Sequence, residues 1–207
     1  NRTRCRRLCR RLGDEQMSEE FIIDTGAAVA EAENITPLPL FDENHPMLRQ
    51  AIPEFDVRKL PNALTNKLIK RLKMTMKLHN GLGLSANQCG VFERIFVIGG
   101  GENVWACINP KIIVSSDDIE KDKEGCLSFP GLSVSIDRPK WVEVEYYNEN
   151  GGLVQMRFDG LTARCFQHEL DHMNGIRFTD HVGPTTLMLA RQKQQKRIKK
   201  ILRRSKK

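Results

Sequence analysis

The stretch FQHELDHMNG, residues 166–175, holds two histidines four positions apart, with a glutamate directly after the first. On a helix, residues i and i+4 lie on one face one turn apart, so His168 and His172 can reach the same metal ion. Glu169 lies off that line and is free to take a proton from a water molecule and pass it on. The H-E-x-x-H pattern therefore indicates a metal-dependent hydrolase; the alternative is a surface helix that happens to carry two histidines.

A catalytic metal needs a third protein ligand beyond two imidazoles. Downstream of His172, Asp180 and His181 are available, but neither lies in a ligand pattern, and no acidic residue follows Asp180. Upstream, Cys126 lies in the loop EGCLSFPG (124–131), and thiolate is a strong ligand for zinc or ferrous iron. Cys126 is therefore the candidate ligand, although a cysteine considered alone is more often a buried structural residue.

The composition is that of one globular domain with basic ends. The chain has 207 residues, of which 40 % are hydrophobic, enough for a sizeable core. Of the net charge of +7, residues 1–16 carry +4 and residues 191–207 carry +10, which leaves −7 for residues 17–190. No apolar run approaches the ~20 residues that span a bilayer, so we expect no membrane partner. The six cysteines include no C-x-x-C pair, which favours a reducing compartment.

Apolar periodicity predicts a helix over residues 61–79, because Leu64, Leu68, Leu72 and Met76 recur every four residues. Strand-like segments follow at residues 94–98, 104–109, 111–115, 141–147 and 153–158. Because these strands come in neighbouring runs with helices before and after, the pattern favours an α+β fold. We expect antiparallel or mixed β-sheets around a central H-E-x-x-H helix, with an N-terminal helix and a basic C-terminal helix.

The chain divides into three predicted parts. Residues 1–35 form a basic and acidic arm, either disordered or upstream of the true start, with Met17 as the candidate initiator. An Arg-rich targeting remnant over residues 1–16 is the alternative reading of the first segment. Residues 36–183 form the catalytic domain, and residues 184–207 form the basic C-terminal helix, with Pro184 at its start.

Three motifs carry a resemblance to a known family. The chain resembles the peptide deformylases, because three motifs occur in that family's order and at about its spacing. The motifs are GLGLSANQ (81–88), EGCLS (124–128) and QHELDH (167–172). Each motif is modest on its own, but three in order are specific, and the resemblance runs from about residue 45 to about residue 182. Ser85 departs from the family's usual alanine, and Met173 from the commoner leucine, which is a volume-conserving change.

The resemblance implies that Cys126, His168 and His172 bind Fe²⁺, which Zn²⁺ or another divalent ion can replace in a purified sample. It implies hydrolysis of the N-formyl group from the N-terminal formyl-methionine of newly synthesised polypeptides in the cytoplasm, with release of formate. An H-E-x-x-H metallopeptidase is the alternative function, and an organelle is the alternative compartment if residues 1–16 are a targeting remnant. A nucleic-acid binder with structural zinc on Cys5, Cys9 and the two histidines ranks last.

The same resemblance assigns roles to individual residues. Glu169 accepts and returns the proton, while the Gln88 side-chain amide and the Leu127 backbone N–H stabilise the oxyanion. Glu124 and Arg138 are expected to form an ion pair that holds the ligand loop. The glycine-rich loop lets an extended peptide approach its backbone, so the expected substrate-binding residues are Gly81, Leu82, Gly83 and Phe129, with Cys165 and Phe166 as further pocket candidates.

The remaining expectations concern partners. The C-terminal helix carries many cations, and bacterial relatives use such a helix at the ribosome, so we expect contact with ribosomal RNA or a ribosomal protein. The other partner is the formyl-methionyl nascent peptide, and the protein is expected to be a monomer.

Overall fold

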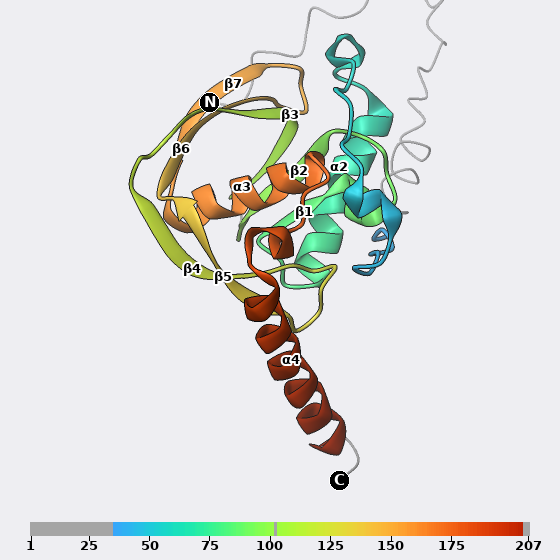
Figure 1. Cartoon of the computed structure of the whole chain (residues 1–207). Coiled ribbons are helices and arrows are strands. Elements are labelled where there is room, and N and C mark those ends of the chain that lie inside the picture. Colours follow the sequence, from blue (N-terminus) through green and yellow to red (C-terminus); the bar gives the residue numbers. More distant parts are fainter. Residues whose placement is uncertain (1–34, 102, 205–207) are drawn as a thin grey trace, which may run out of the picture. The chain divides into compact units, whose positions relative to one another are not determined.

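The computed structural model describes residues 35–101 and 103–204, so the predictions for residues 1–34 lie outside the described part of the chain. Five antiparallel strands form the main sheet in the order β1-β2-β3-β6-β7 (Figure 1). These strands are β1 Gly83–Ser85, β2 Ile95–Gly100, β3 Asn103–Ser115, β6 Trp141–Tyr147 and β7 Leu153–Asp159. A separate antiparallel pair is formed by β4 Ile119–Gly125 and β5 Ser133–Pro139. The α+β class with antiparallel sheets is as predicted.

Three α-helices accompany the sheets: α2 Ala63–Leu78, α3 Gly160–Met173 and α4 Pro184–Arg204. Helix α3 packs against strands of both sheets, whereas α4 projects away from them beyond its first turns (Figure 1). Short 3₁₀ turns lie at Pro46–Arg49 (η1), Val57–Lys59 (η2), Ala86–Cys89 (η3) and Phe178–His181 (η4). Within the described residues, the helices are all too short or too polar to cross a membrane.

Helix α2 buries a different face from the one predicted at its start. Leu64 is 82 % exposed, so its assignment to the apolar face was wrong. The buried stripe runs through Thr65, Ile69, Leu72 and Met76, spaced by three and four residues. Leu64 precedes this stripe by one position, which turns its side chain about 100° away from the sheet.

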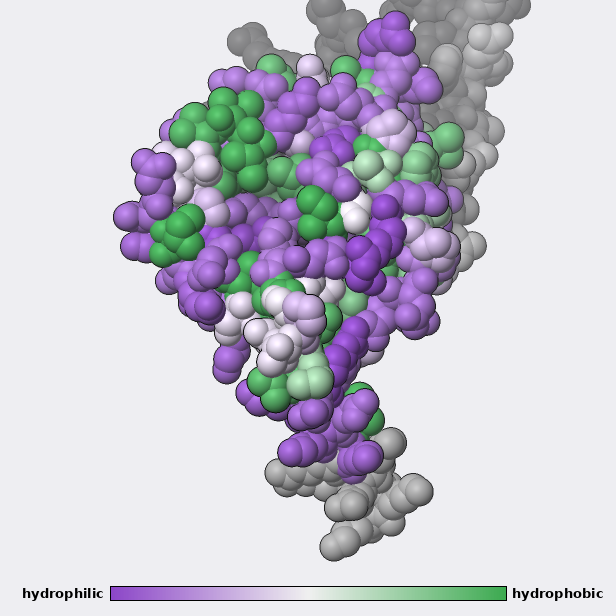
Figure 2. Space-filling view, viewed as in Figure 1, coloured by the Kyte–Doolittle hydropathy of each residue, from purple (hydrophilic) through white to green (hydrophobic). Residues whose placement is uncertain are grey.

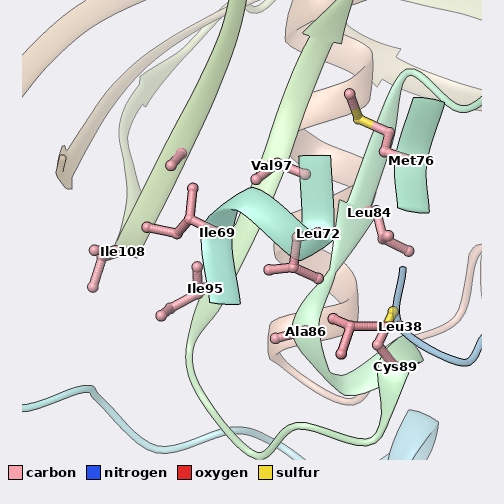
Figure 3. Packing of buried hydrophobic residues seen from close by; sticks show 11 residues of the cluster. Leu38, Ile69, Leu72, Met76, Leu84, Ala86, Cys89, Ile95, Val97 and Ile108 are labelled. Atoms are coloured by element: carbon pink, nitrogen blue, oxygen red, sulfur yellow. The ribbon is translucent and has the colours of Figure 1, made fainter. Parts of the chain in front are cut away.

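The core next to the predicted loop motif is formed by side chains from α2, β1, η3, β2 and β3, together with Leu38 (Figure 3). Leu72 and Leu84 are fully buried there, and Ala86 and Cys89 extend the cluster into η3. The glycine-rich segment was predicted as a loop, but the core holds part of it as β1, paired with β2 from Gly83↔Ile98 onward. Its backbone is therefore fixed by both packing and strand pairing.

The two strands expected over residues 104–115 are one strand, β3, with an irregularity in its middle. The pairing with β6 shifts between Ile108 and Lys111, and Asn109 adopts a positive φ of 50°. Pro110 has no N–H to donate to the ladder, which explains why the pairing breaks there. The Asn109 side chain compensates by bonding both the N–H and the C=O of Phe55, at 2.7 and 2.9 Å.

Strand β4 was not predicted, because its sequence IEKDKEG is charged and has low β-propensity. It forms through pairing with β5, in register from Ile119↔Pro139 to Gly125↔Ser133. The ladder ends at Gly125, directly before Cys126, so β4 delivers the predicted third ligand to the end of a hydrogen-bonded hairpin.

Candidate metal centre

Helix α3 and the end of β4 bring the three predicted ligands together. Cys126 Sγ lies 3.3 Å from His172 Nε2, and one ligand atom each from Cys126, His168 and His172 lie within 4.8 Å of one another. The two imidazole rings have centroids 5.1 Å apart, as expected for neighbouring turns of one helix face. Among the described residues, this is the one group of His, Cys, Asp or Glu side chains compact enough to hold a metal ion.

The donor set fits a divalent metal. His168 donates from Nδ1 to Glu124 Oε2 at 3.0 Å, which leaves its Nε2 available as a ligand. The buried atom Glu169 Oε2 has no protein hydrogen-bond partner in the described part of the chain, so it can bond a further group at this site. One thiolate and two imidazoles with room for a further ligand match a catalytic zinc or ferrous site.

Glu169 lies beside the ligands with only 4 % of its surface exposed. Burial raises the pKa of Glu169 to about 7, while the charge of His168 and the Ser85 hydroxyl act in the opposite direction. Its carboxylate rests against Gly83, where a Cβ atom would come within 2.4 Å of Oε1. The missing side chain at Gly83 therefore makes the space that Glu169 occupies.

Gln88 is fully enclosed and its amide has a defined orientation. Its Oε1 accepts from the Ser85 backbone N–H at 3.0 Å and from the Ser85 hydroxyl at 2.8 Å. Its Nε2 consequently faces Cys126 Sγ and Ser128 Oγ, each at 3.2 Å. The amide nitrogen thus points toward the predicted ligand Cys126 and the neighbouring Ser128, and Ser85, the departure from the usual alanine, supplies one of the two bonds that hold it there.

A cavity of about 320 Å³ opens above the ligands. The predicted site and pocket residues line it, with the exceptions of His172, whose Nε2 lies 3.3 Å from Cys126 Sγ, and Phe166. The residues in its wall include Gly81, Leu82, Gly83, Gln88, Cys126, Leu127, Phe129, Cys165, His168 and Glu169. Phe166, proposed as a pocket residue, is instead fully buried in the core, with its ring 5.1 Å from that of Phe96, because it lies on the opposite side of α3.

The predicted ion pair between Glu124 and Arg138 is confirmed, and it is buried. Arg138 donates from Nε and Nη2 to the two carboxylate oxygens of Glu124, at 2.9 and 3.0 Å. Burial opposes the charge of Glu124, but the hydrogen bonds from His168 and Arg138 outweigh it and lower the pKa of Glu124 to about 2. Sequence reasoning missed Arg164 and Asp171, which extend this network. The one available signal was the spacing of Arg164, one helical turn before His168.

The weaker ligand candidates do not join the cluster. His181 Nε2 bonds Asp171 Oδ2 at 2.7 Å, and Asp180 pairs with Arg49 and Arg177. Cys5 and Cys9, the other half of the zinc-binding alternative, lie outside the described residues.

The model of the polypeptide deformylase family matches residues 37–187. The chain belongs to this family. It is 42 % identical over 137 residues to the peptide deformylase of Thermotoga neapolitana, an alignment that covers 66 % of this chain and 83 % of the relative.

Solved structures agree with this assignment. The peptide deformylase of Synechococcus elongatus in complex with actinonin superposes with a TM-score of 0.71 at 32 % identity, over 89 % of this chain and 91 % of that one. The Met-Ala-Ser-bound enzyme of Acinetobacter baumannii has a TM-score of 0.68 at 28 % identity, over 70 % of this chain and 98 % of that one. The chain is thus a metal-dependent hydrolase that removes the N-formyl group from new polypeptides, and a metallopeptidase is not favoured.

Proposed function

We propose that this deformylase holds its metal on Cys126, His168 and His172, with Fe²⁺ as the native ion and Zn²⁺ as a possible substitute. The observation that carries the proposal is the convergence of these three ligand atoms beneath the cavity, next to Glu169. A metal bound there supplies Lewis acidity, which lowers the pKa of a water molecule and polarises a carbonyl. The choice of iron over zinc as the native ion rests on the family resemblance, because the donor set suits both ions.

In this proposal Glu169 moves the protons. Glu169 is buried beside the proposed ligands, and its Oε2 has no hydrogen-bond partner among the described residues, so it can take a proton from water and give it to the departing amine. The Gln88 amide hydrogens and the Leu127 backbone N–H stabilise the negative charge that develops on the formyl oxygen. The orientation of Gln88 by Ser85 supports its part in this role.

The substrate lies beside β1, which is at the end of the strand order and has β2 as its neighbour on one side. An extended formyl-methionyl peptide then aligns with Gly81, Leu82 and Gly83 as an added strand. The methionine side chain enters the cavity against Phe129. The Met-Ala-Ser complex of the Acinetobacter enzyme supports a peptide of this kind as the ligand.

Substitution of Cys126 tests the ligand assignment. Cys126→Ala removes the thiolate, so we expect the purified protein to bind less than one metal ion per chain and to lose formate release. Cys107→Ala is the control, because this cysteine is fully buried in the core and away from the cluster. Equal metal content in Cys126→Ala and the unmodified protein, both prepared anaerobically, would remove Cys126 from the site.

We propose residues 36–183 as the catalytic domain, with α3 as its central element, acting as a monomer in the cytoplasm. The basic C-terminal segment is then residues 184–207, within which the structure describes α4 over Pro184–Arg204, and the first turns of α4 also serve the domain. Gln194 Nε2 donates to Pro130 O at 2.7 Å, and Arg191 donates to Glu43 at 2.9 Å. The first contact holds the loop that follows Cys126, so a truncation that tests ribosome binding must spare Gln194.

The part of α4 beyond Gln194 is proposed to bind the ribosome. Residues 196–207 include eight Lys and Arg and no acid, and the described outer part of α4 is mainly hydrophilic in Figure 2. A chain ending at residue 195 should keep full deformylase activity but bind ribosomes more weakly than the full chain. Cosedimentation at low and high salt measures this difference, which should shrink as salt rises. Equal cosedimentation of the two chains at low salt would contradict the proposal.

A further inference from the structure

Arg164 makes an unusual set of buried contacts on α3, one turn before His168. Its side chain is 5 % exposed. Nη1 donates to Glu124 Oε1 at 2.9 Å and to the Ile136 carbonyl at 3.0 Å, while Nη2 donates to the Glu120 carbonyl at 2.7 Å. One guanidinium therefore joins three elements: α3, β4 through Glu120 and Glu124, and β5 through Ile136.

We propose that Arg164 is a positioning residue for the metal centre, which acts by holding Glu124 in the one orientation that fixes both His168 and the Cys126 loop. The inference rests on the proposed ligand set of Cys126, His168 and His172. Arg164 is not itself one of the proposed ligands, and it acts through Glu124.

The hydrogen bonds of Glu124 explain why one arginine is not enough. Its Oε1 accepts from Arg138 Nε and Arg164 Nη1, and its Oε2 accepts from Arg138 Nη2 and His168 Nδ1. Arg138 is shared, because its Nη1 donates to Asp171 at 2.7 Å. Among the described residues, Arg164 is therefore the arginine of this network whose ion pair is with Glu124 and with no second carboxylate.

The position of Glu124 transmits this restraint to the ligands. It lies two residues before Cys126, at the end of the β4–β5 ladder, and it bonds the metal-distal nitrogen of His168. A carboxylate that orients a ligating histidine commonly changes metal affinity by about 10- to 100-fold when it is perturbed. Loss of Arg164 should loosen Glu124, and through it both ligands, without removing any ligand.

The variant Arg164→Met isolates this effect. Methionine keeps an unbranched apolar stem along the cavity wall, which Arg164 lines, and removes all three donated bonds. Arg164→Lys keeps the charge but not the planar fork, so one ammonium cannot reproduce the same set of bonds. Arg157→Met is the control, because Arg157 is an exposed arginine on β7 whose ion pair is with Asp159.

The experiment measures release of Co²⁺ from the loaded protein to a chelator, together with the visible absorption spectrum of the bound Co²⁺. We expect Arg164→Met to release the metal about tenfold faster or more and to shift the spectrum, with Arg164→Lys intermediate and Arg157→Met unchanged. A merely structural role would lower the unfolding temperature without altering the spectrum of the folded, loaded protein.

The inference fails if Arg164→Met, or Arg164→Lys where the methionine variant does not fold, matches the unmodified protein in both release rate and spectrum. Cys126→Ala, run alongside, separates this failure from failure of the ligand assignment. If Cys126→Ala keeps the unmodified spectrum, the ligand set is wrong; if it loses that spectrum while Arg164→Met keeps it, only the role of Arg164 is wrong.

Discussion

Gly83→Ala should disable the enzyme while leaving it folded. A Cβ at this position would lie 2.4 Å from Glu169 Oε1 and 2.8 Å from both Glu169 Cγ and Cys165 Sγ, whereas ordinary contacts are 3.4–4 Å. Gly83 does not adopt a positive φ, so its backbone tolerates alanine and the conflict is with side chains. The cheapest relief is a displacement of the Glu169 carboxylate by about 1 Å, and a shift of this size costs about 10²-fold in turnover.

The assay is formate release from formyl-Met-Ala-Ser, with kcat and KM determined separately and the metal content measured. We expect kcat of Gly83→Ala to fall by about 10²-fold with the metal retained, and a destabilisation of no more than about 1–3 kcal/mol. Gly100→Ala is the matched control, since a Cβ there meets nothing closer than Leu82 at 4.0 Å. Activity of Gly83→Ala equal to that of Gly100→Ala would refute the idea that the space at Gly83 places Glu169.

Two further predictions concern Ser85 and Glu124. Ser85→Ala removes one of the two bonds to Gln88 Oε1, worth about 1 kcal/mol, so kcat should fall about fivefold with KM unchanged; an unchanged kcat would show that the backbone bond suffices. The pKa of Glu124 is about 2 when folded against ~4.3 when unfolded, so its charge stabilises the fold fully above pH ~4.5, and this contribution is lost as the pH falls through 2. Urea unfolding of the metal-free protein should therefore show Glu124→Gln far less stable than the unmodified chain at neutral pH, with the gap closing in acid. A gap independent of pH would contradict this.

Helical spacing was enough to place His168 and His172 on one face, because periodicity is local information. The proposed third ligand was harder to find, because Cys126 lies 42 residues before His168, and only elimination and the EGCLS motif pointed to it. Strand β4, which ends directly before Cys126, could not be predicted because its sequence is charged and has low β-propensity. The strand is held by its pairing with β5. The position of Cys126 next to the two histidines therefore depends on the pairing of β4 with β5, which the motif does not reveal.

The buried network of Arg164 and Glu124 could not be predicted from the sequence for a related reason. An arginine such as Arg164 on an amphipathic helix reads as solvated, yet here it is buried because Glu124 and two strand carbonyls accept its hydrogen bonds. For Leu64 the prediction was wrong in the opposite sense. This apolar residue was expected to be buried, but it is exposed because it lies one position away from the buried stripe of α2. In both cases the deciding partners come from distant parts of the chain.

Glu169 is proposed to move protons at a Cys-His-His metal site that hydrolyses formyl groups. The most direct test is formate release from formyl-Met-Ala-Ser per bound metal ion, in anaerobically prepared unmodified protein and in Glu169→Gln. Glutamine keeps the shape of the side chain but cannot accept the proton, so the variant should retain about one metal ion per chain and release formate at least ~10²-fold more slowly. Formate release by Glu169→Gln at the unmodified rate, with the same metal content, would contradict the claim.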